Sequence, residues 1–149
     1  MTKLLSVAHS MVTANYIVMP NHANPSGSAF GGTIISWIDI CAAMVAQKHA
    51  NSYVVTVHID EITLKAPVVV GDHVLVQGEL KWTGETSMII SVEVHGSNPL
   101  TGQSEHVTTA SLTMVSVDDN KKPKKIPGIQ IKNSAEQKSF DYFAAKRHS

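Results

Sequence analysis

The sequence predicts an α+β domain in which an antiparallel sheet of five to six strands wraps around one long central helix. Residues 31–49 form a single, almost wholly apolar segment of helical length. One strand-like stretch precedes this segment, and four strand-like stretches with short connections follow it, which favours antiparallel neighbours. Since 149 residues suffice for one domain with a core, we expect a folded domain over residues 1–127 and a polar, basic tail over residues 128–149.

The composition excludes several classes of protein. The net charge is zero but unevenly divided, because residues 1–117 carry 4 basic and 8 acidic residues, whereas residues 118–149 carry 8 basic and 4 acidic ones. The basic residues lack interleaved aromatic residues, so nucleic acid is not an expected partner. No apolar run is long enough to span a membrane, and the first residues make a poor signal peptide. A single cysteine, Cys41, suits a reducing compartment, and we expect a cytoplasmic protein.

The first elements follow from residue types. Residues 11–19 are rich in apolar and β-branched residues and end at Pro20, which is typical of a strand stopped by proline. A loop over residues 20–29 leads into the helix, predicted over residues 31–49. At 1.5 Å per residue the helix would be about 28 Å long, enough to cross a small sheet. It should end at the turn over residues 50–52.

The rest of the domain should be sheet. Strands are predicted over residues 53–65, 73–82, 86–95 and 105–117, separated by stretches rich in turn residues. In the third of these strands apolar and polar residues alternate, which predicts one buried face, with Ile89 as the exception. Residues 133–147 are predicted to form a short helix, and we expect the core to survive its deletion.

The central helix carries one unexplained charge, Asp39, before Lys48. A helix that is apolar on all sides is normally buried, and an unpaired carboxylate there is costly. Asp39 is therefore either bonded to a hydroxyl or backbone group of the sheet, or is a general base or nucleophile. One sheet cannot cover all the apolar faces of this helix, so we expect a second subunit against the remaining face and hence a homodimer.

Gly31 and Gly32 are the second feature of interest. Glycines at a helix start leave backbone N–H groups open to a developing oxyanion, or they merely permit a turn or a close approach. Asp39 lies eight residues after Gly31, which is about 12 Å along the axis, so one helix cannot easily present both to the same carbonyl. Two antiparallel helices of a symmetric dimer could. Any chemistry should therefore straddle a subunit interface.

Several other kinds of site are excluded by their missing motifs. Residues 27–33, GSAFGGT, lack the lysine of a phosphate-binding loop, and there is no GxSxG nucleophile motif. The eight histidines include no HExxH and no pair spaced i, i+4, so we expect no dedicated metal site.

The run NPSGSAFGG at residues 24–32, followed by Asp39, resembles the signature loop and helix of the hotdog-fold acyl-CoA thioesterases, in particular the bacterial acyl-CoA hydrolases. The similarity continues at residues 55–57 (VTV), 67–72 (PVVVGD), 84–87 (GETS) and 125–127 (KIP), and covers about residues 12–127. The family fold, a sheet around one helix with paired sheets in a dimer, agrees with the organisation predicted above. Two departures stand out: Leu64 replaces a usual aromatic residue, and Pro25 follows Asn24.

The resemblance implies hydrolysis of acyl-CoA to a free acid and CoA, without a cofactor. Asp39 would activate water or attack the thioester, Asn24 of the opposite subunit would orient water or the carbonyl, and the Gly31 and Gly32 amides would hold the oxyanion. The implied CoA-binding residues are Gly84, Thr86, Ser87, Lys124 and Lys125. The resemblance also implies a homo-oligomer, commonly a hexamer built as a trimer of dimers.

Two alternatives remain open on the same fold. One is a non-catalytic acyl-CoA binder or sensor, against which the presence of Asp39 argues. The other is a dehydratase or hydratase acting on 3-hydroxyacyl thioesters, for which His22 is the nearby candidate base. The sequence does not determine the acyl chain length.

Overall fold

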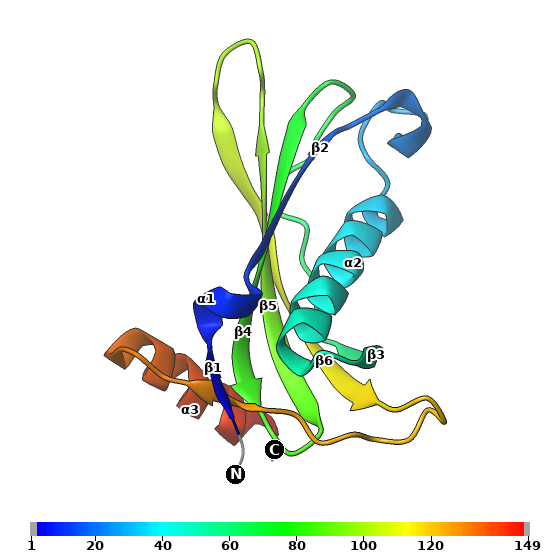
Figure 1. Ribbon diagram of the computed structural model, residues 1–149. Coiled ribbons are helices and arrows are strands. Elements are labelled where there is room, and N and C mark those ends of the chain that lie inside the picture. Colours follow the sequence, from blue (N-terminus) through cyan, green and yellow to red (C-terminus); the bar gives the residue numbers. More distant parts are fainter. Residues whose placement is uncertain (1–2, 148–149) are drawn as a thin grey trace.

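The structure is a computed structural model that describes residues 3–147. A curled, five-stranded antiparallel sheet in the order β2-β4-β5-β6-β3 wraps around the long helix α2 (Figure 1). A second, two-stranded parallel sheet joins β1 to β7 near the chain ends. The elements are β1 (Leu4–Ser6), α1 (Val7–Ser10), β2 (Val12–Ile17), a 3₁₀ turn (Pro20–His22), α2 (Gly31–Ala50), β3 (Tyr53–Ile59), β4 (His73–Thr83), β5 (Ser87–Ser97), β6 (Ser104–Val117), β7 (Gly128–Gln130) and α3 (Ser134–Arg147). The predicted α+β class is confirmed.

Helix α2 packs closely on the sheet along one side. Ile38, Cys41 and Val45 of this helix are fully buried, and opposite them stands Gly78 of β4. A Cβ added at Gly78 would lie 2.8 Å from Cys41 Sγ and 2.9 Å from a Val45 methyl group. Glycine is therefore needed at this position, because any side chain would push the helix off the sheet.

The ends of α2 agree with the sequence. The helix begins at Gly31 and ends at Ala50, where Asn51 takes a left-handed conformation (φ 53°) and donates its N–H to Gln47 O at 2.7 Å. Asparagine is one of the few non-glycine residues that tolerate this conformation. The predicted turn at residues 50–52 is therefore confirmed.

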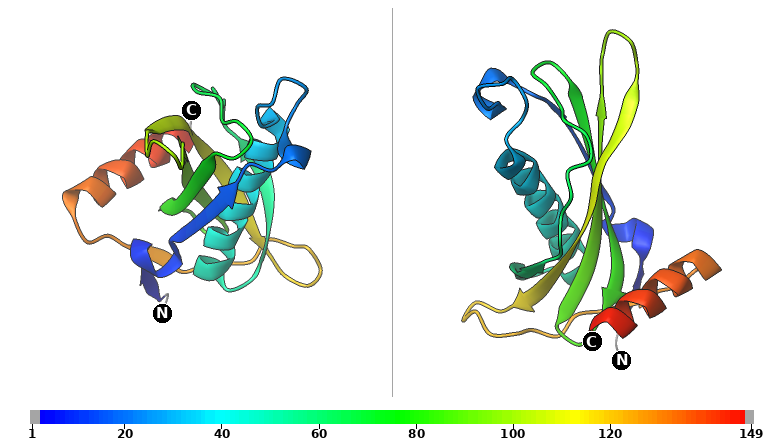
Figure 2. Two further views of the ribbon diagram at one scale, coloured as in Figure 1. Left: turned by 90° about the horizontal axis from the view of Figure 1, so that it is seen from above. Right: turned by 180° about the vertical axis from the view of Figure 1, so that it is seen from behind.

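The outer face of the sheet is covered in part by α3, which lies on the side opposite to α2 (Figure 2). The Phe140 ring of α3 stands 6.4 Å from the ring of Trp82 in β4, and Lys146 pairs with Asp60 at 2.7 Å. Burial beneath this helix accounts for Ile89, the apolar residue that breaks the alternation of β5, because Ile89 lines a cavity together with residues near the end of α3. The predicted helix at residues 133–147 is confirmed.

The predicted strand at residues 53–65 is wrong in its second half, because β3 ends at Ile59. Beyond that point the chain makes only scattered backbone bonds to β6, from Asp60 N to Ser111 O (2.9 Å) and from Lys65 N to Val107 O (2.8 Å). The register of β3 on β6 already shifts between Thr56 and His58. Two successive acidic residues then follow, 60 and 61, and these are poor strand formers. The short elements β1, α1 and β7 were not predicted.

The first residues of the predicted tail are tied to the domain. β7 pairs with β1, and Ile126, just before it, is buried in the core. His49 near the end of α2 donates its Nε2–H to Pro127 O at 2.7 Å. The side chain of His49 is 1% exposed, and its Nδ1 makes no hydrogen bond within residues 3–147. Burial therefore lowers the pKa of His49 below its ordinary value of 6.5.

We predict that His49 makes the fold less stable in acid. Burial lowers the pKa of His49 in the folded protein, whereas the unfolded chain binds a proton as the pH falls through about 6.5, so the free energy of unfolding should decrease below that pH. Urea titrations between about pH 8 and pH 5 measure the slope. His49→Gln keeps an N–H donor without titrating, and its slope should be smaller. Equal slopes in the two proteins would contradict the assignment.

We also predict that a chain ending at residue 133 still folds. α3 has no buried residue, so its loss should lower the free energy of unfolding by only about 1–3 kcal/mol. It should also expose Trp82 and shift tryptophan emission to longer wavelength. Phe140→Ala in the full chain removes the ring contact alone and serves as the control. Loss of a cooperative unfolding transition would show that α3 belongs to the core.

Candidate active site

Asp39 is half-buried on the middle of α2 and faces the edge strand β3. Thr56 of β3 donates its hydroxyl to Asp39 Oδ1 at 2.8 Å. The carboxylate therefore has the hydroxyl partner from the sheet that was one of the two sequence-based interpretations. That bond engages Oδ1 and orients the carboxylate. The second oxygen, Oδ2, makes no hydrogen bond within residues 3–147. The two interpretations are thus compatible, because an oriented carboxylate can still act as a base.

The sheet edge beside Asp39 is open in the single chain. β3 is an edge strand, and it exposes apolar residues on both faces: Ile59 shares the α2-facing row of Thr56 by register, whereas Val57 lies on the outer face, where it lines a cavity with Ile89. On α2, next to Asp39 in sequence, Ile40 is 52% exposed. An exposed apolar edge strand is a template for pairing with another chain. The open sheet edge and the exposed Ile40 support a second subunit beside α2.

Asn24 lies in a short hairpin between the 3₁₀ turn and α2. The two arms meet at an isolated bridge between Ala23 and Ala29, and Asn24 N donates to Ser28 O at 2.8 Å. Gly27 at the tip has a φ of 91°, which only glycine adopts readily. The hairpin therefore presents Asn24 from a defined backbone instead of a loose loop.

The side-chain oxygen of Asn24 is fully engaged. Asn24 Oδ1 accepts from Ser26 N (3.0 Å), Ser26 Oγ (2.7 Å) and Ser28 N (3.2 Å). Two of these donors are backbone N–H groups, which fixes the amide orientation. Asn24 Nδ2 makes no hydrogen bond within the described part of the chain. Asn24 can therefore donate to a carbonyl oxygen or to a water oxygen, but it has no free acceptor with which to take a proton from water.

The backbone angles and the space around Gly31 and Gly32 bear on the structural interpretation of these glycines. Neither glycine has a positive φ, so no turn requires them. A Cβ at Gly32 would meet nothing within 4 Å, and one at Gly31 would make an ordinary contact of 3.4 Å with Leu64. Their N–H groups stand at the free start of α2, where no preceding turn supplies acceptors. No turn or close packing thus requires Gly32, and the oxyanion role of the two N–H groups stays a prediction.

The predicted CoA-binding residues lie together. Gly84, Thr86 and Ser87 form the turn between β4 and β5, closed by a bond from Gly84 N to Ser87 O at 2.8 Å. Ser116 N donates to Thr86 O, Lys124 N donates to Ser116 O, and Ile126 N donates to Glu85 O. The segment carrying Lys124 and Lys125 therefore runs beside the turn. A Cβ at Gly84 would lie 2.7 Å from the Trp82 ring, so glycine is required there.

The predicted residues fall at opposite ends of α2. Asn24, Gly31 and Gly32 stand at its start, whereas the β4–β5 turn and the lysine segment lie beyond its far end (Figure 1). Lys124 also lines a cavity of about 500 Å³ with Asp118 and Asp119, so these carboxylates offset part of its charge. A single chain thus separates the residues predicted to bind the oxyanion from the residues predicted to bind CoA.

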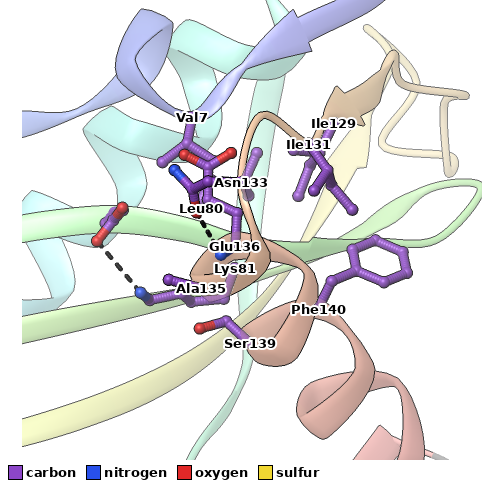
Figure 3. Close-up of a pocket in the computed structure, with 11 residues that line it drawn as sticks. Val7, Leu80, Lys81, Ile129, Ile131, Asn133, Ala135, Glu136, Ser139 and Phe140 are labelled. Carbon is purple, nitrogen blue, oxygen red and sulfur yellow. Dashed lines mark hydrogen bonds and ion pairs between the residues drawn. The ribbon is translucent and has the colours of Figure 1, made fainter.

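A cavity of about 270 Å³ beneath α3 is separate from these residues (Figure 3). It lies between α3 and β4 on the outer face of the sheet and includes Phe140 and the ion pair of Lys81 with Glu79 at 3.2 Å. None of the predicted site residues lines it. Within residues 3–147 no group of three or more His, Cys, Asp or Glu residues could hold a metal ion, and no helix there is long and apolar enough to cross a membrane.

Comparisons with known proteins agree on one family. The model of the thioesterase superfamily matches residues 26–103. An uncharacterized acyl-CoA thioester hydrolase of Bacillus subtilis, YkhA, is 31% identical over 148 residues, covering 94% of this chain and 86% of the relative. The crystal structure of an apo-hexameric acyl-CoA thioesterase superimposes with a TM-score of 0.93 at 37% identity, covering 98% of this chain and 94% of that one.

A third similar protein is the acyl-CoA hydrolase of Staphylococcus aureus, solved with butyryl-CoA and CoA. It has a TM-score of 0.88 at 28% identity and covers 97% of this chain and 88% of that one. Three variants of it have been solved, each with one residue replaced by alanine: an asparagine, an aspartate and a threonine. The aspartate lies 15 positions after the asparagine and 17 before the threonine. Asn24, Asp39 and Thr56 have the same separations.

Sequence reasoning gave Thr56 no role of its own. Residues 55–57 were noted for their resemblance, but a threonine in a strand is unremarkable by composition. Its hydrogen bond to Asp39 becomes visible only in the fold, where β3 places the threonine hydroxyl beside the carboxylate. The expectation that Asp39 bonds to a hydroxyl group of the sheet was the one signal that could have identified Thr56.

We predict opposite effects of alanine at two glycines. Gly32→Ala should leave stability unchanged or raise it by about 0.5 kcal/mol, because the space is open and alanine favours helix. Gly78→Ala, the matched control, should destabilise by about 1–3 kcal/mol, because its Cβ would overlap Cys41. Thermal unfolding measures both. A loss of stability in Gly32→Ala would show that this glycine is structural.

Proposed function

We propose that this chain, which belongs to the thioesterase superfamily, hydrolyses acyl-CoA thioesters to free carboxylic acids and CoA at a site shared between two subunits. The observation that carries the proposal is the arrangement of Asn24, Asp39 and Thr56. Asp39 is held by Thr56, Asn24 presents a free N–H donor from a braced hairpin, and the spacing matches the residues varied in the S. aureus acyl-CoA hydrolase.

In the proposed reaction the thioester carbonyl oxygen accepts from Asn24 Nδ2 and from the N–H groups at the start of α2. These donors stabilise the negative charge that develops on that oxygen. Asp39 of the other subunit either takes a proton from water as the water oxygen attacks the carbonyl carbon, or attacks that carbon itself. In the first route the C–S bond breaks, and the sulfur of CoA leaves with the electron pair and takes up the proton held by Asp39. In the second route the C–S bond breaks as an anhydride of Asp39 and the acyl group forms; water then hydrolyses the anhydride to the free acid and the Asp39 carboxylate, and a proton of that water goes to the sulfur. In a single turnover in labelled water, ¹⁸O in Asp39 would show direct attack, because only an anhydride that water opens at the Asp39 carbonyl leaves the label in the protein.

The shared site is supported by distance and by surface. Asp39 stands about 12 Å along the helix from the Gly31 end, and it lies beside the open edge strand β3 and next to the exposed Ile40. Antiparallel pairing of two α2 helices would place the glycine end of one beside Asp39 of the other. The same pairing would bring the β4–β5 turn and Lys124 or Lys125 of the one chain toward the acyl-transfer residues of its partner.

The proposal includes a homo-oligomer with the dimer as its smallest active unit and a hexamer, a trimer of dimers, as the full assembly. The hexameric thioesterase structure that superimposes on this chain supports it. A cytoplasmic location is part of the same proposal. Cys41, whose pKa burial raises to about 11, remains an unreactive thiol and suits a reducing compartment.

The geometry speaks against both alternatives. A non-catalytic acyl-CoA binder has no need for a carboxylate oriented by its own hydrogen bond, as Asp39 is. A dehydratase would need His22 as its base. The Nδ1 of His22 already accepts from Met19 N at 3.0 Å, so in the neutral ring the proton is on Nε2 and no lone pair is free. The dehydratase alternative predicts loss of water from 3-hydroxyacyl-CoA, and a wild-type protein without this activity would remove it.

Complementation tests whether two subunits share the site. Asp39→Asn should lower kcat for thiol release from acyl-CoA at least about 100-fold, and Asn24→Ala should do so by a similar factor. Each mixed dimer of the two variants contains one site with both native residues, so co-expressed and co-purified mixtures should recover roughly a quarter of wild-type activity. Each variant alone is the control. No recovery in verified mixed dimers would place both residues in one subunit, and full activity in Asp39→Asn would overturn the hydrolase proposal.

Thr56→Val tests the orienting bond. Valine keeps the shape of threonine and removes the hydroxyl that Asp39 Oδ1 accepts, so kcat should fall about tenfold while KM changes little. Thr56→Ser keeps the hydroxyl and should stay within about threefold of wild type. Steady-state thiol release on a panel of acyl-CoA chain lengths provides the measurement. Equal kcat in the valine and serine variants would mean that the bond does not contribute.

A further inference from the structure

His22 stands at the base of the hairpin that presents Asn24. Its Nδ1 accepts from Met19 N at 3.0 Å, and its carbonyl oxygen accepts from Phe30 N at 2.9 Å. Phe30 is the residue that immediately precedes α2. One residue thus links the end of β2, the incoming arm of the hairpin and the start of the central helix.

The His22 ring also packs against the helix. It meets the Trp37 ring of α2 edge to face, with centroids 5.2 Å apart and planes at 83°. Trp37 is itself stacked on Tyr16 of β2 at 4.3 Å and 10°. Edge-to-face and offset-stacked rings are the favoured arrangements of aromatic pairs. The ring of His22 is therefore fixed on one side by an aromatic pair and on the other by a backbone N–H.

The two arms of the hairpin are held in different ways. The outgoing arm is bonded to the loop before β4, where Ala29 N donates to Val68 O at 2.8 Å and Val70 N donates to Gly27 O at 3.1 Å. The incoming arm runs from the 3₁₀ turn, and there His22 supplies the side-chain bond to Met19 N. Losing that bond leaves the N–H of Met19 without its acceptor and loosens the arm that carries Asn24.

We infer that His22 is a positioning residue, which sets the placement of the Asn24 amide through the base of the hairpin and takes no proton in the reaction. The inference rests on the proposed function, because it assumes that Asn24 Nδ2 donates to the thioester carbonyl. Asn24 Oδ1 is bonded to the hairpin itself, so the amide moves with the hairpin as one body. A shift at the base therefore moves the donor relative to the carbonyl.

Two substitutions separate the hydrogen bond from the ring contact. His22→Leu keeps an apolar side chain against Trp37 and removes the acceptor. His22→Gln removes the ring and restores an acceptor, because glutamine at this position of a helical turn accepts from the N–H three residues earlier. We expect kcat to fall about fivefold to tenfold in His22→Leu, with KM within about twofold, and to return to within about twofold of wild type in His22→Gln.

Hydrogen exchange of the Met19 amide supplies a readout that does not depend on activity. Exchange should be faster in His22→Leu than in wild type and slow again in His22→Gln. Unchanged exchange in His22→Leu, unchanged kcat despite faster exchange, or failure of a folded His22→Gln to restore both would each overturn the inference. If wild type hydrolyses no acyl-CoA, the proposed function fails, while the exchange result still decides whether His22 braces the hairpin.

One more test uses only the wild-type protein, so it can be carried out even if His22→Leu does not fold. An Nδ1 that accepts from a backbone N–H requires the proton on Nε2 in the neutral ring. Nitrogen-15 NMR of the imidazole in alkaline buffer distinguishes the two neutral tautomers. The Nε2–H form is the expected result, and the Nδ1–H form would overturn the inference.

Discussion

The close packing of α2 on β4 is the constraint on which the rest of the structure depends. Gly78 allows Cys41 and Val45 to approach the sheet backbone, and this contact fixes how the helix is rotated about its axis. With that side buried, Asp39 on the neighbouring side is turned toward the edge strand β3, where Thr56 meets it. The orientation of the carboxylate is thus set by packing at a glycine that has no part in the chemistry.

Much of this arrangement could be predicted from local sequence. The apolar run and the turn residues around it predicted the ends of α2 to within one residue, and the alternation of apolar and polar residues predicted the buried face of β5. The strand beyond Ile59 was predicted wrongly, because Ile62 and Leu64 have strand composition while the register shift in β3 and the charges after it end the ladder. β1 and β7 pair residues more than a hundred positions apart, Leu4 with Gly128, and no local pattern reports such a contact.

The candidate site was predictable in its parts but not in its contacts. Sequence left two interpretations open for the glycines at the start of α2, and only the structure shows that neither a positive φ nor a close contact requires Gly32. The same data show that Gly84 is needed on steric grounds, since Trp82 fills the place of a side chain. The hydrogen bonds of Thr56 and of the Asn24 side-chain oxygen depend on which groups the fold brings together. The spacing of these residues in the sequence does not predict those contacts.

The hydrogen bonds of Asn24 determine which groups each subunit can supply to the proposed shared site. Asn24 Oδ1 already accepts three hydrogen bonds within its own hairpin. Asn24 and the start of α2 therefore offer only donors, whereas Asp39 offers an acceptor. Donors can polarise a carbonyl but cannot activate water, and a carboxylate does the reverse. If the helices pair antiparallel, each subunit supplies donors to one site and the acceptor to the other. Neither half can then turn over alone, and hydrolysis becomes conditional on assembly.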